Sequence, residues 1–356
     1  MDGARGLAAA AVRPGRARFG DVRASGVVES VDVRSQPLGT GWWALVGDFE
    51  GRVRAWRFDR LGPASSDEAV WRGPHPDSWT TSLDRAGYIG AVEAVRERIR
   101  EGDVYQANIC RLLAAPCGRP DAGALARLLA AGNPAPYAGF VDVPPDGDDE
   151  GVWLVSASPE LFLEIGRRRV SSGPIKGTAT TASGLGAKDR AENVMITDLV
   201  RNDLQRVCRP GTVRVSSLLA VQHHPGLVHL VSTVTGRLRD DVAGAADFWP
   251  RLLEAAYPPG SVSGAPKSSA LRIIGELEPV PRGPYCGLVG WARVGRAGAV
   301  AARLAVGIRT FWWAGGQLRF GTGAGITWGS DPGAEWEETE LKARRLVALA
   351  SGALRP

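Results

Sequence analysis

Hydrophobic and polar positions follow two different periods along this chain. Between Leu83 and Ile99 the apolar residues recur every three or four positions, which predicts an amphipathic helix between Ser82 and Gly102. The same spacing predicts five further helices, at 121–131, 187–206, 243–256, 267–277 and 332–350.

Strands are predicted where apolar residues alternate or cluster between turn signals. Residues 41–58 predict a hairpin that turns at Glu50 and Gly51. Further strands are predicted at 103–113, 152–157, 161–166, 169–172, 212–222, 227–238, 285–294, 299–311 and 317–321. Strands and helices come in runs rather than in strict alternation. This favours an α+β fold with antiparallel sheets and helices packed outside.

The length and the N-terminus bound the class of protein. A chain of 356 residues suits one large domain or two fused ones. No apolar run reaches the roughly 20 residues that a membrane span needs. The first 20 residues hold a short alanine run between arginines but no apolar signal-peptide core. We therefore expect a disordered tail and a cytoplasmic protein.

The charge distribution and the cysteine spacing argue against nucleic-acid binding and against a zinc site or disulfide framework. The net charge is +5, with a pI of about 9.3. The arginines are scattered, and no basic tract is interleaved with aromatic residues, so nucleic-acid binding is disfavoured. An anionic small-molecule substrate or compositional bias explains the charge equally well. The four cysteines match neither a zinc pattern nor a disulfide framework.

Only four of the 43 basic residues are lysines: Lys176, Lys188, Lys267 and Lys342. Unlike arginine, lysine offers a primary amine that burial can make nucleophilic. Lys176 lies in the segment SSGPIKGTATT, where Pro174 and Gly177 indicate a rigid loop. The spacing is not that of a phosphate-binding loop. A nucleophile, an anion contact and chance survival in an arginine-rich composition all remain open at this point.

Two predicted helices each carry a carboxylate pair at i, i+3. The pairs are Asp189 with Glu192, and Glu335 with Glu338. Residues three apart share a helix face, so facing helices would gather four carboxylates around a cation such as Mg²⁺. Two solvated acidic faces near helix N-termini explain the pattern as well.

Other polar residues are weak signals when taken singly. Glu160 follows a predicted strand beside apolar residues, which suits either a general acid or a solvated turn. Arg309 and Lys342 are candidate clamps for substrate carboxylates. The glycine-rich segment 321–327 offers backbone N–H groups to an anion. His229, between Val228 and Leu230, has the setting of a buried core residue.

Taken in order, ten segments between about residues 79 and 350 resemble the chorismate-utilising enzymes. They are GDVYQANICR, SPELF, GPIKGT, AKDRAENVMITDLVRNDL, VHLVSTV, PPGSVSGAPK, YCGLVGW, GIRTF, GAGITWGSDP and AEWEETELK. The resemblance implies two large antiparallel β-sheets packed face to face with helices outside, and Mg²⁺ bridging the enzyme to the ring carboxylate of chorismate. The chain departs from the large members of the family in a shortened N-terminal region at 21–78, which we expect to contribute strands and which follows the tail of 1–20. The catalytic domain is expected at 79–356.

Two positions divide the chemistry within that family. Lys176 resembles the lysine of members in which this side chain adds to C2 of chorismate while the C4 hydroxyl leaves. Gln106 stands where the water-adding members carry a lysine base. Both positions imply amination of C4 by ammonia, giving 4-amino-4-deoxychorismate for 4-aminobenzoate and folate synthesis.

The resemblance also implies a role for each matching residue. Glu160 matches the general acid that protonates the departing hydroxyl. The two carboxylate pairs match the Mg²⁺ ligands, with direct ligation favoured for Glu192 and Glu338 and ligation through water for Asp189. Positions that contact the substrate are matched by Thr178, His229, Arg309, Gly325 and Lys342.

The source of ammonia and three alternatives stay open. The sequence contains no Cys–His–Glu amidotransferase segment, so we expect free ammonia or a separate glutamine amidotransferase subunit. The alternatives are amination at C2, as in an anthranilate or aminodeoxyisochorismate synthase, the same C4 reaction serving a specialised metabolite, and a non-catalytic chorismate-binding subunit. The stretch 27–32 only faintly resembles an inhibitor-site motif, and we expect no tryptophan site.

Overall fold

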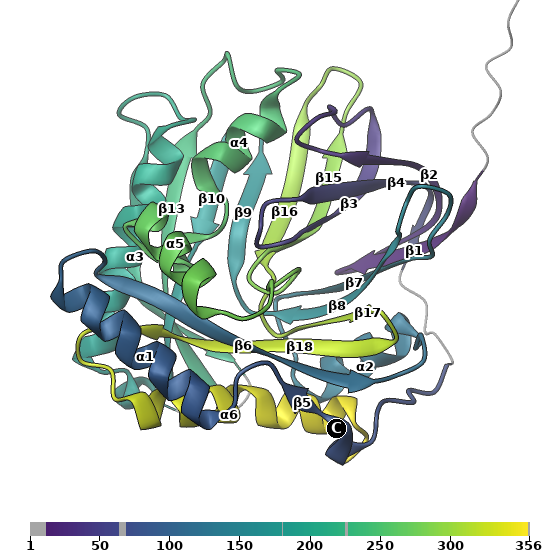
Figure 1. Ribbon diagram of the computed structural model, residues 1–356. Coiled ribbons are helices and arrows are strands. Elements are labelled where there is room, and N and C mark those ends of the chain that lie inside the picture. The colour runs from purple at the N-terminus through teal and green to yellow at the C-terminus, as the bar shows by residue number, and fades with distance from the viewer. Residues whose placement is uncertain (1–11, 64–68, 180, 225–226, 355–356) are drawn as a thin grey trace, which may run out of the picture.

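The computed structural model describes residues 12–63, 69–179, 181–224 and 227–354 (Figure 1). Its strands are β1 (Arg13–Phe19), β2 (Val22–Asp32), β3 (Gly41–Gly47), β4 (Val53–Pro63), β5 (Thr80–Thr81), β6 (Gln106–Pro116), β7 (Tyr137–Val143), β8 (Val152–Ser158), β9 (Leu161–Gly166), β10 (Arg169–Gly173), β11 (Ile175–Ala179), β12 (Arg214–His224), β13 (Leu227–Arg237), β14 (Gly264–Ala265), β15 (Leu288–Val294), β16 (Val300–Val306), β17 (Thr310–Ala314) and β18 (Gln317–Ile326). Its helices are α1 (Arg85–Arg100), α2 (Ala122–Gly132), α3 (Ala187–Gln205), α4 (Phe248–Ala256), α5 (Lys267–Leu277) and α6 (Pro332–Ala350), with short 3₁₀ turns η1 (Pro76–Ser78), η2 (Ala182–Gly184) and η3 (Gly260–Val262).

The strands form one continuous antiparallel network among the described residues. A first layer runs β13–β10–β9–β16–β15–β3–β4–β2. Strand β1 then pairs with β2 on one side and with β7 on the other, and so leads into a second layer, β7–β8–β17–β18–β6. Figure 1 shows β9, β10 and β16 of the first layer running upward and β8, β17, β18 and β6 of the second layer running across the lower half. The predicted α+β fold is confirmed, with the two layers joined through β1 and β2.

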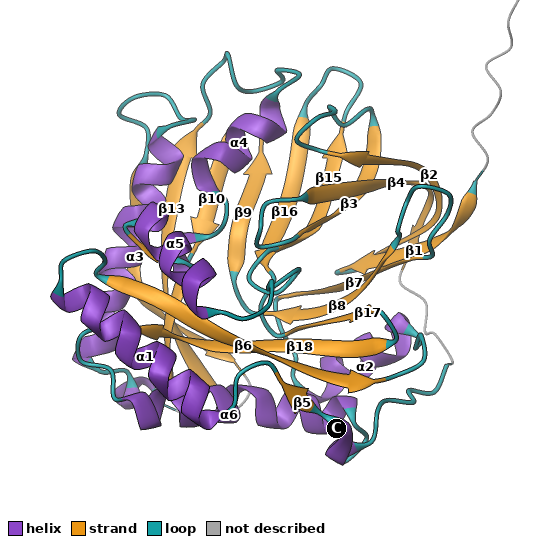
Figure 2. Ribbon diagram, in the orientation of Figure 1, coloured by secondary structure: helices purple, strands orange, loops and turns teal. Residues whose placement is uncertain are grey.

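Helices cover the outer faces of both layers (Figure 2). Helix α6 packs against β18, α1 and α2, and α2 also contacts β7 and β8. Helix α3 packs against β11, β12 and β13 of the first layer. Helix α3 therefore lies beside the strand that carries Lys176, and α6 lies beside β18.

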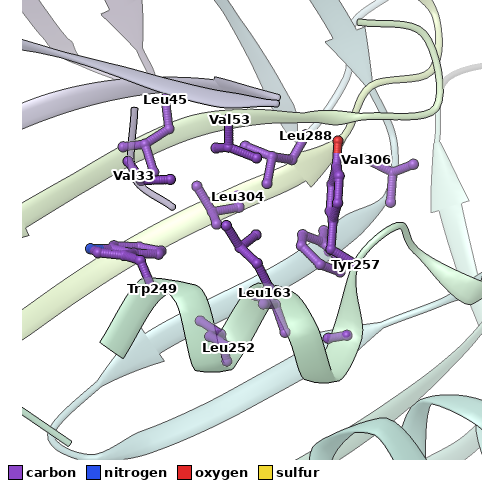
Figure 3. Close-up of a cluster of buried hydrophobic side chains, with 14 of the residues drawn as sticks. Val33, Leu45, Val53, Leu163, Trp249, Leu252, Tyr257, Leu288, Leu304 and Val306 are labelled. Atoms are coloured by element: carbon purple, nitrogen blue, oxygen red, sulfur yellow. The ribbon is translucent and has the colours of Figure 1, made fainter. Parts of the chain in front are cut away.

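The largest hydrophobic cluster joins α4 to the strands of the first layer (Figure 3). Trp249 and Leu252 of α4 lie among Leu45, Leu163 and Leu304 from three strands, and all five are at least 95 % buried. Truncating one such leucine to alanine typically costs about 2–5 kcal/mol. This cluster fixes α4 against the strands of the first layer.

The N-terminal stretch is more ordered than the sequence predicts. Part of the tail expected over 1–20 forms β1, in which Ala17 is fully buried, while residues 1–11 lie outside the described residues. The arginines between the buried positions obscure the strand pattern. Arg16 donates to Asp121 at 2.9 Å and to Asp142 at 3.1 Å, so its charge is compensated after folding.

Most other predicted elements are confirmed, with two differences of note. The strand expected over 299–311 divides into β16 and β17 at Gly307–Arg309. A side chain on Gly307 would place its Cβ 2.3 Å from the Pro284 carbonyl oxygen, and Arg309 has a φ of 51°. Strands β2, β5, β7, β11 and β14 lie outside the predicted strand ranges, and Lys176, expected in a rigid loop, lies on β11. Within the described residues, no helix is long and apolar enough to cross a membrane.

Candidate active site

Lys176 lies on β11 at an irregularity in the strand ladder. The pairing of β11 with β13 shifts register between Lys176 and Thr178, and the intervening Gly177 has a φ of 75°. Such a bulge redirects a side chain out of the regular alternation. The Lys176 side chain is 13 % exposed, and its Nζ lies 4.0 Å from Glu192 Oε2. Burial lowers the pKa of Lys176, although the Glu192 carboxylate opposes that effect.

Gly325 on β18 leaves open the space into which Lys176 projects. A Cβ at this position would lie 2.2 Å from Gln106 Nε2, 2.8 Å from Asn108 Oδ1 and 3.2 Å from Lys176 Nζ. Asn108 is the cross-strand partner of Gly325 in the β6–β18 ladder. Only glycine therefore allows these three polar groups to share one cradle. Gly325 belongs to the site as predicted, and it shapes the space rather than supplying a side chain.

Glu160 lies between β8 and β9 and is 3 % exposed. Its backbone N–H donates to the Ser158 hydroxyl at 3.2 Å, and its carbonyl accepts from the Val306 N–H at 3.0 Å. Burial raises the pKa of its carboxyl to about 7, although the Ser261 hydroxyl, the Lys176 charge and the Ile175 N–H oppose the rise. A carboxyl with a pKa near neutrality can both give and take a proton at physiological pH.

The two predicted carboxylate pairs face one another from α3 and α6. Lys188 Nζ donates to Glu335 Oε1 at 3.3 Å and lies 3.9 Å from Glu192 Oε1. Lys342 Nζ lies 2.6 Å from Glu338 Oε1. Burial raises the pKa of Glu192 despite the nearby lysines. An added cation at this position would therefore stabilise the ionised carboxylate.

Asp189 has a different partner from the three glutamates. Its Oδ2 accepts the Gly186 N–H at 2.8 Å at the start of α3. Its side chain also packs against Gly177, where a Cβ would lie 2.8 Å from Asp189 Cβ. Asp189 thus packs against the glycine that follows Lys176 in β11.

The remaining predicted substrate contacts come from β11, β13 and the turn between β16 and β17. Arg309 lies in the turn between β16 and β17, and burial alone lowers the pKa of its guanidinium. No carboxylate among the described residues pairs with it. His229 on β13 is 1 % exposed and lies opposite Thr178 in the ladder. The side chain of Thr178 lies outside what the structure describes.

A small cavity lies behind Glu160, with room for about one water-sized molecule. Ser172, Asp203 and Ser261 supply polar groups to its otherwise apolar wall. Lys267 Nζ donates to Asp203 Oδ2 at 2.7 Å and to the Ala256 carbonyl at 3.2 Å. Lys267, one of the four lysines, therefore has a structural partner away from the cradle.

A protein-family profile described as chorismate binding enzyme matches residues 64–348. The chain belongs to this family. It is 37 % identical over 324 residues to an aminodeoxychorismate synthase of Streptomyces griseus, covering 85 % of the chain and 42 % of that protein. It is 34 % identical over 336 residues to an aminodeoxychorismate synthase component 1 of Klebsiella aerogenes, covering 89 % and 71 %. It is also 39 % identical over 282 residues to an anthranilate synthase component 1 of Streptomyces coelicolor, covering 76 % and 52 %.

Two solved structures confirm the fold of this chorismate-binding enzyme. A putative 2,3-dihydroxybenzoate-specific isochorismate synthase from Bacillus anthracis superposes with a TM-score of 0.76 at 23 % identity, covering 95 % of this chain and 96 % of that one. Anthranilate synthase component I from Streptococcus pneumoniae TIGR4 gives 0.74 at 22 %, covering 98 % and 95 %. These two likenesses concern the fold alone.

Two residues of the site were missed by sequence reasoning. Asn108 lies within the quoted segment GDVYQANICR, two positions after Gln106 and therefore on the same face of β6, and this spacing could have drawn attention to it. Ser261, in η3, hydrogen-bonds the Glu160 carboxyl, and its backbone carbonyl accepts from Asn108 Nδ2 at 2.8 Å. Nothing local in the sequence indicates that contact.

Proposed function

We propose that this enzyme catalyses the Mg²⁺-dependent amination of chorismate at C4, the reaction of an aminodeoxychorismate synthase component 1. The observation that carries the proposal is the buried Lys176 amine, whose pKa is lowered and whose charge acts on a Glu160 with a pKa of about 7. A desolvated amine that can act as a nucleophile, together with a carboxyl that can give a proton, is the pairing that covalent addition with loss of a hydroxyl requires.

The proposed chemistry balances over two steps. The Lys176 amine forms a bond to C2, the ring double bonds shift towards C4, and the C4–O bond breaks as Glu160 gives its proton to the hydroxyl, which leaves as water. Ammonia then bonds to C4, the double bonds shift back, and the C2–N bond breaks to restore the lysine. The new C4 ammonium returns one proton to the Glu160 carboxylate.

The position of Gln106 disfavours water as the nucleophile. Its side chain is fully buried and its Nε2 lies 3.5 Å from Glu192 Oε2. An amide does not take a proton at neutral pH, so Gln106 provides no base to activate water. Ammonia needs no such activation, since its lone pair is already free.

The glutamates of α3 and α6 fit the implied Mg²⁺. Carboxylate oxygens are the hard ligands that Mg²⁺ prefers, and Glu192 and Glu335 already converge on one cation, the Lys188 ammonium. No group of three ligating side chains is assembled within the described part of the chain. Glu338, whose Oε1 pairs with Lys342, would join the first two. When bound there, Mg²⁺ would neutralise a substrate carboxylate.

The remaining assignments follow from charge and from the names of the relatives. Arg309 and Lys342 would bind the carboxylates of chorismate, with His229 and Thr178 lining the ring. A separate glutamine amidotransferase would supply the ammonia, which the words "component 1" in the Klebsiella relative's name support. The product would serve 4-aminobenzoate and folate synthesis, or a specialised aminobenzoate derivative.

The test is product identity. Purified protein would be incubated with chorismate, Mg²⁺ and ammonium at alkaline pH, with and without aminodeoxychorismate lyase. We expect 4-aminobenzoate only when the lyase is present. Anthranilate formed without the lyase would establish amination at C2, which the similarity to the Streptomyces coelicolor relative keeps as the second candidate. No conversion under any condition would favour a non-catalytic chorismate-binding subunit.

Two variants test the nucleophile. Lys176→Ala removes the amine, and Lys176→Arg keeps a positive charge without a nucleophilic amine. We expect both to lose amination by roughly a thousandfold, about 4 kcal/mol in activation free energy. Full activity in Lys176→Arg would show that this residue acts by charge alone.

A further inference from the structure

Two amide oxygens in the candidate site have no hydrogen-bond donor. Gln106 is fully buried and Asn108 is 7 % exposed. Among the described residues, no donor reaches Oε1 of Gln106 or Oδ1 of Asn108. Proteins seldom leave a buried acceptor unsatisfied, because its lost hydration is not replaced. The two oxygens therefore indicate a ligand that donates hydrogen bonds.

Neighbouring groups decide which way each amide points. Asn108 Nδ2 donates to the Ser261 carbonyl oxygen at 2.8 Å, and Gln106 Nε2 faces Glu192 Oε2 at 3.5 Å. Turning either amide over would bring oxygen against oxygen. The backbone of Asn108 is held as well, since its N–H donates to the Ser263 carbonyl and its own carbonyl accepts from Arg282. Both oxygens are thus fixed acceptors.

These acceptors lie beside the amine that is proposed to react. Asn108 Oδ1 and Lys176 Nζ lie 2.8 Å and 3.2 Å from the same point, the position of a Cβ on Gly325. Gln106 Nε2 lies 2.2 Å from that point. The cradle left open by Gly325 therefore brings the Asn108 acceptor and the Gln106 amide group close to the reacting lysine.

The chemistry of the two reactants decides which of them fits. Chorismate carries two carboxylates, an ether oxygen and a single hydroxyl, so nearly all of its polar atoms are acceptors. Ammonia carries three N–H donors and one lone pair. Two fixed acceptors can hold two N–H groups and leave the lone pair free to attack the ring. An amide oxygen does not take a proton at neutral pH, and so does not favour the unreactive ammonium ion as a carboxylate would.

We propose that Asn108 Oδ1 and Gln106 Oε1 form the binding site for the incoming ammonia molecule. The inference rests on the proposed amination but not on whether C2 or C4 is attacked. It assigns a function to Asn108. It also means that Gln106 binds the nucleophile, in addition to providing no base that could activate water. Ser261 then links the nucleophile site to the general acid, because its carbonyl holds Asn108 while its hydroxyl bonds Glu160.

The test separates affinity for ammonia from affinity for chorismate. Initial rates would be measured with Asn108→Ala at saturating chorismate and Mg²⁺, with ammonium chloride varied at fixed pH. The dissociation constant of chorismate would be obtained by calorimetry. Losing one hydrogen bond to the nucleophile should raise the KM for ammonia about fivefold, while chorismate binding stays unchanged.

A matched control is Asn193→Ala. Asn193 is also fully buried, and its Nδ2 likewise donates to a backbone carbonyl, that of Leu230 at 3.0 Å. Its loss should lower thermal stability without a selective rise in the KM for ammonia. Gln106→Met removes the other acceptor and gives an independent test should Asn108→Ala fail to fold.

Three results would overturn the proposal. One is weaker chorismate binding with an unchanged KM for ammonia, which would mean that the acceptors face the substrate hydroxyl. The second is no change in either constant. The third is an equal rise in the KM for ammonia in Asn193→Ala. If the wild-type protein produces no aminated product, the proposed function itself is refuted. The assay of the wild-type protein shows this before any variant is made.

Discussion

Lys188 Nζ lies 3.3 Å from Glu335 Oε1 and so connects α3 to the C-terminal helix α6. The same ammonium lies 3.9 Å from Glu192 Oε1, one turn along its own helix. Glu335 is 4 % exposed, and a carboxylate so buried needs a cation nearby. Lys188, to which the sequence assigns no step, therefore holds together two of the carboxylates that are proposed to bind Mg²⁺.

We expect Lys188→Met to destabilise the metal-free protein and to tighten metal binding. The first effect follows because two glutamates lose their cation, and the second because Mg²⁺ no longer competes with an ammonium. Since Lys188 is half exposed, the stability loss should be only about 1 kcal/mol. Thermal unfolding in EDTA and calorimetric titration with Mg²⁺ measure the two effects. Arg190→Met, which removes an exposed charge from the same helix, is the control. Unchanged metal affinity in Lys188→Met would mean that the bridge is only structural.

Glu160→Gln should become increasingly more stable than the wild type as pH rises from about 4.5 to 7. The folded-state pKa is raised to about 7, so the folded protein holds a proton that the unfolded chain has released. Stability of the wild type therefore falls with rising pH across this window, and glutamine removes that dependence. The difference should approach about 3 kcal/mol above pH 7. Urea unfolding at several pH values measures it. A constant difference would show that the Glu160 pKa is not raised.

Arg309→Gln should weaken chorismate binding and leave the fold intact or stabilised. Its guanidinium is partly buried without a carboxylate partner among the described residues, so its charge costs free energy until an anion binds. Losing a charged hydrogen bond to the substrate costs about 1.5–3 kcal/mol, about 10- to 100-fold in affinity. Calorimetry with chorismate and thermal unfolding test both parts. Arg303→Gln, which removes a surface partner of Glu164, is the control. A large loss of stability in Arg309→Gln with normal chorismate affinity would contradict the assignment.

Gly325→Ala should abolish most activity while the protein still folds. The added Cβ would lie 2.2 Å from Gln106 Nε2 and 3.2 Å from Lys176 Nζ, so both side chains must move. Overpacking of this kind costs about 1–3 kcal/mol in stability. We expect at least a roughly tenfold loss in kcat, because displaced reacting groups lose their alignment. Gly329→Ala is the control, since a Cβ there meets nothing within 4 Å. Equal activity in both variants would remove Gly325 from the site.

The sequence predicted the bounds of some helices and strands accurately and missed others. Helices α5 and α6 and strand β9 have the predicted bounds, because their periods are strong and local. Strand β1 was missed because two of its arginines find partners more than one hundred residues away: Arg13 pairs with Asp149, and Arg16 pairs with Asp121 and Asp142. The break at Arg309 was missed because it depends on a close approach to Pro284.

The amino-acid sequence by itself determined the kind of protein and the set of reactive residues. The rarity of lysine, the two carboxylate pairs and the ordered segments depend on residue identity and spacing, which sequence carries directly. Only the tertiary structure decided which role each of these residues has. Lys188 bridges Glu192 and Glu335, and Asp189 packs against Gly177 beside Lys176. Asn108 and Ser261 join the site. Burial and cross-strand distance set those roles, and both arise only when strands far apart in the chain are brought together.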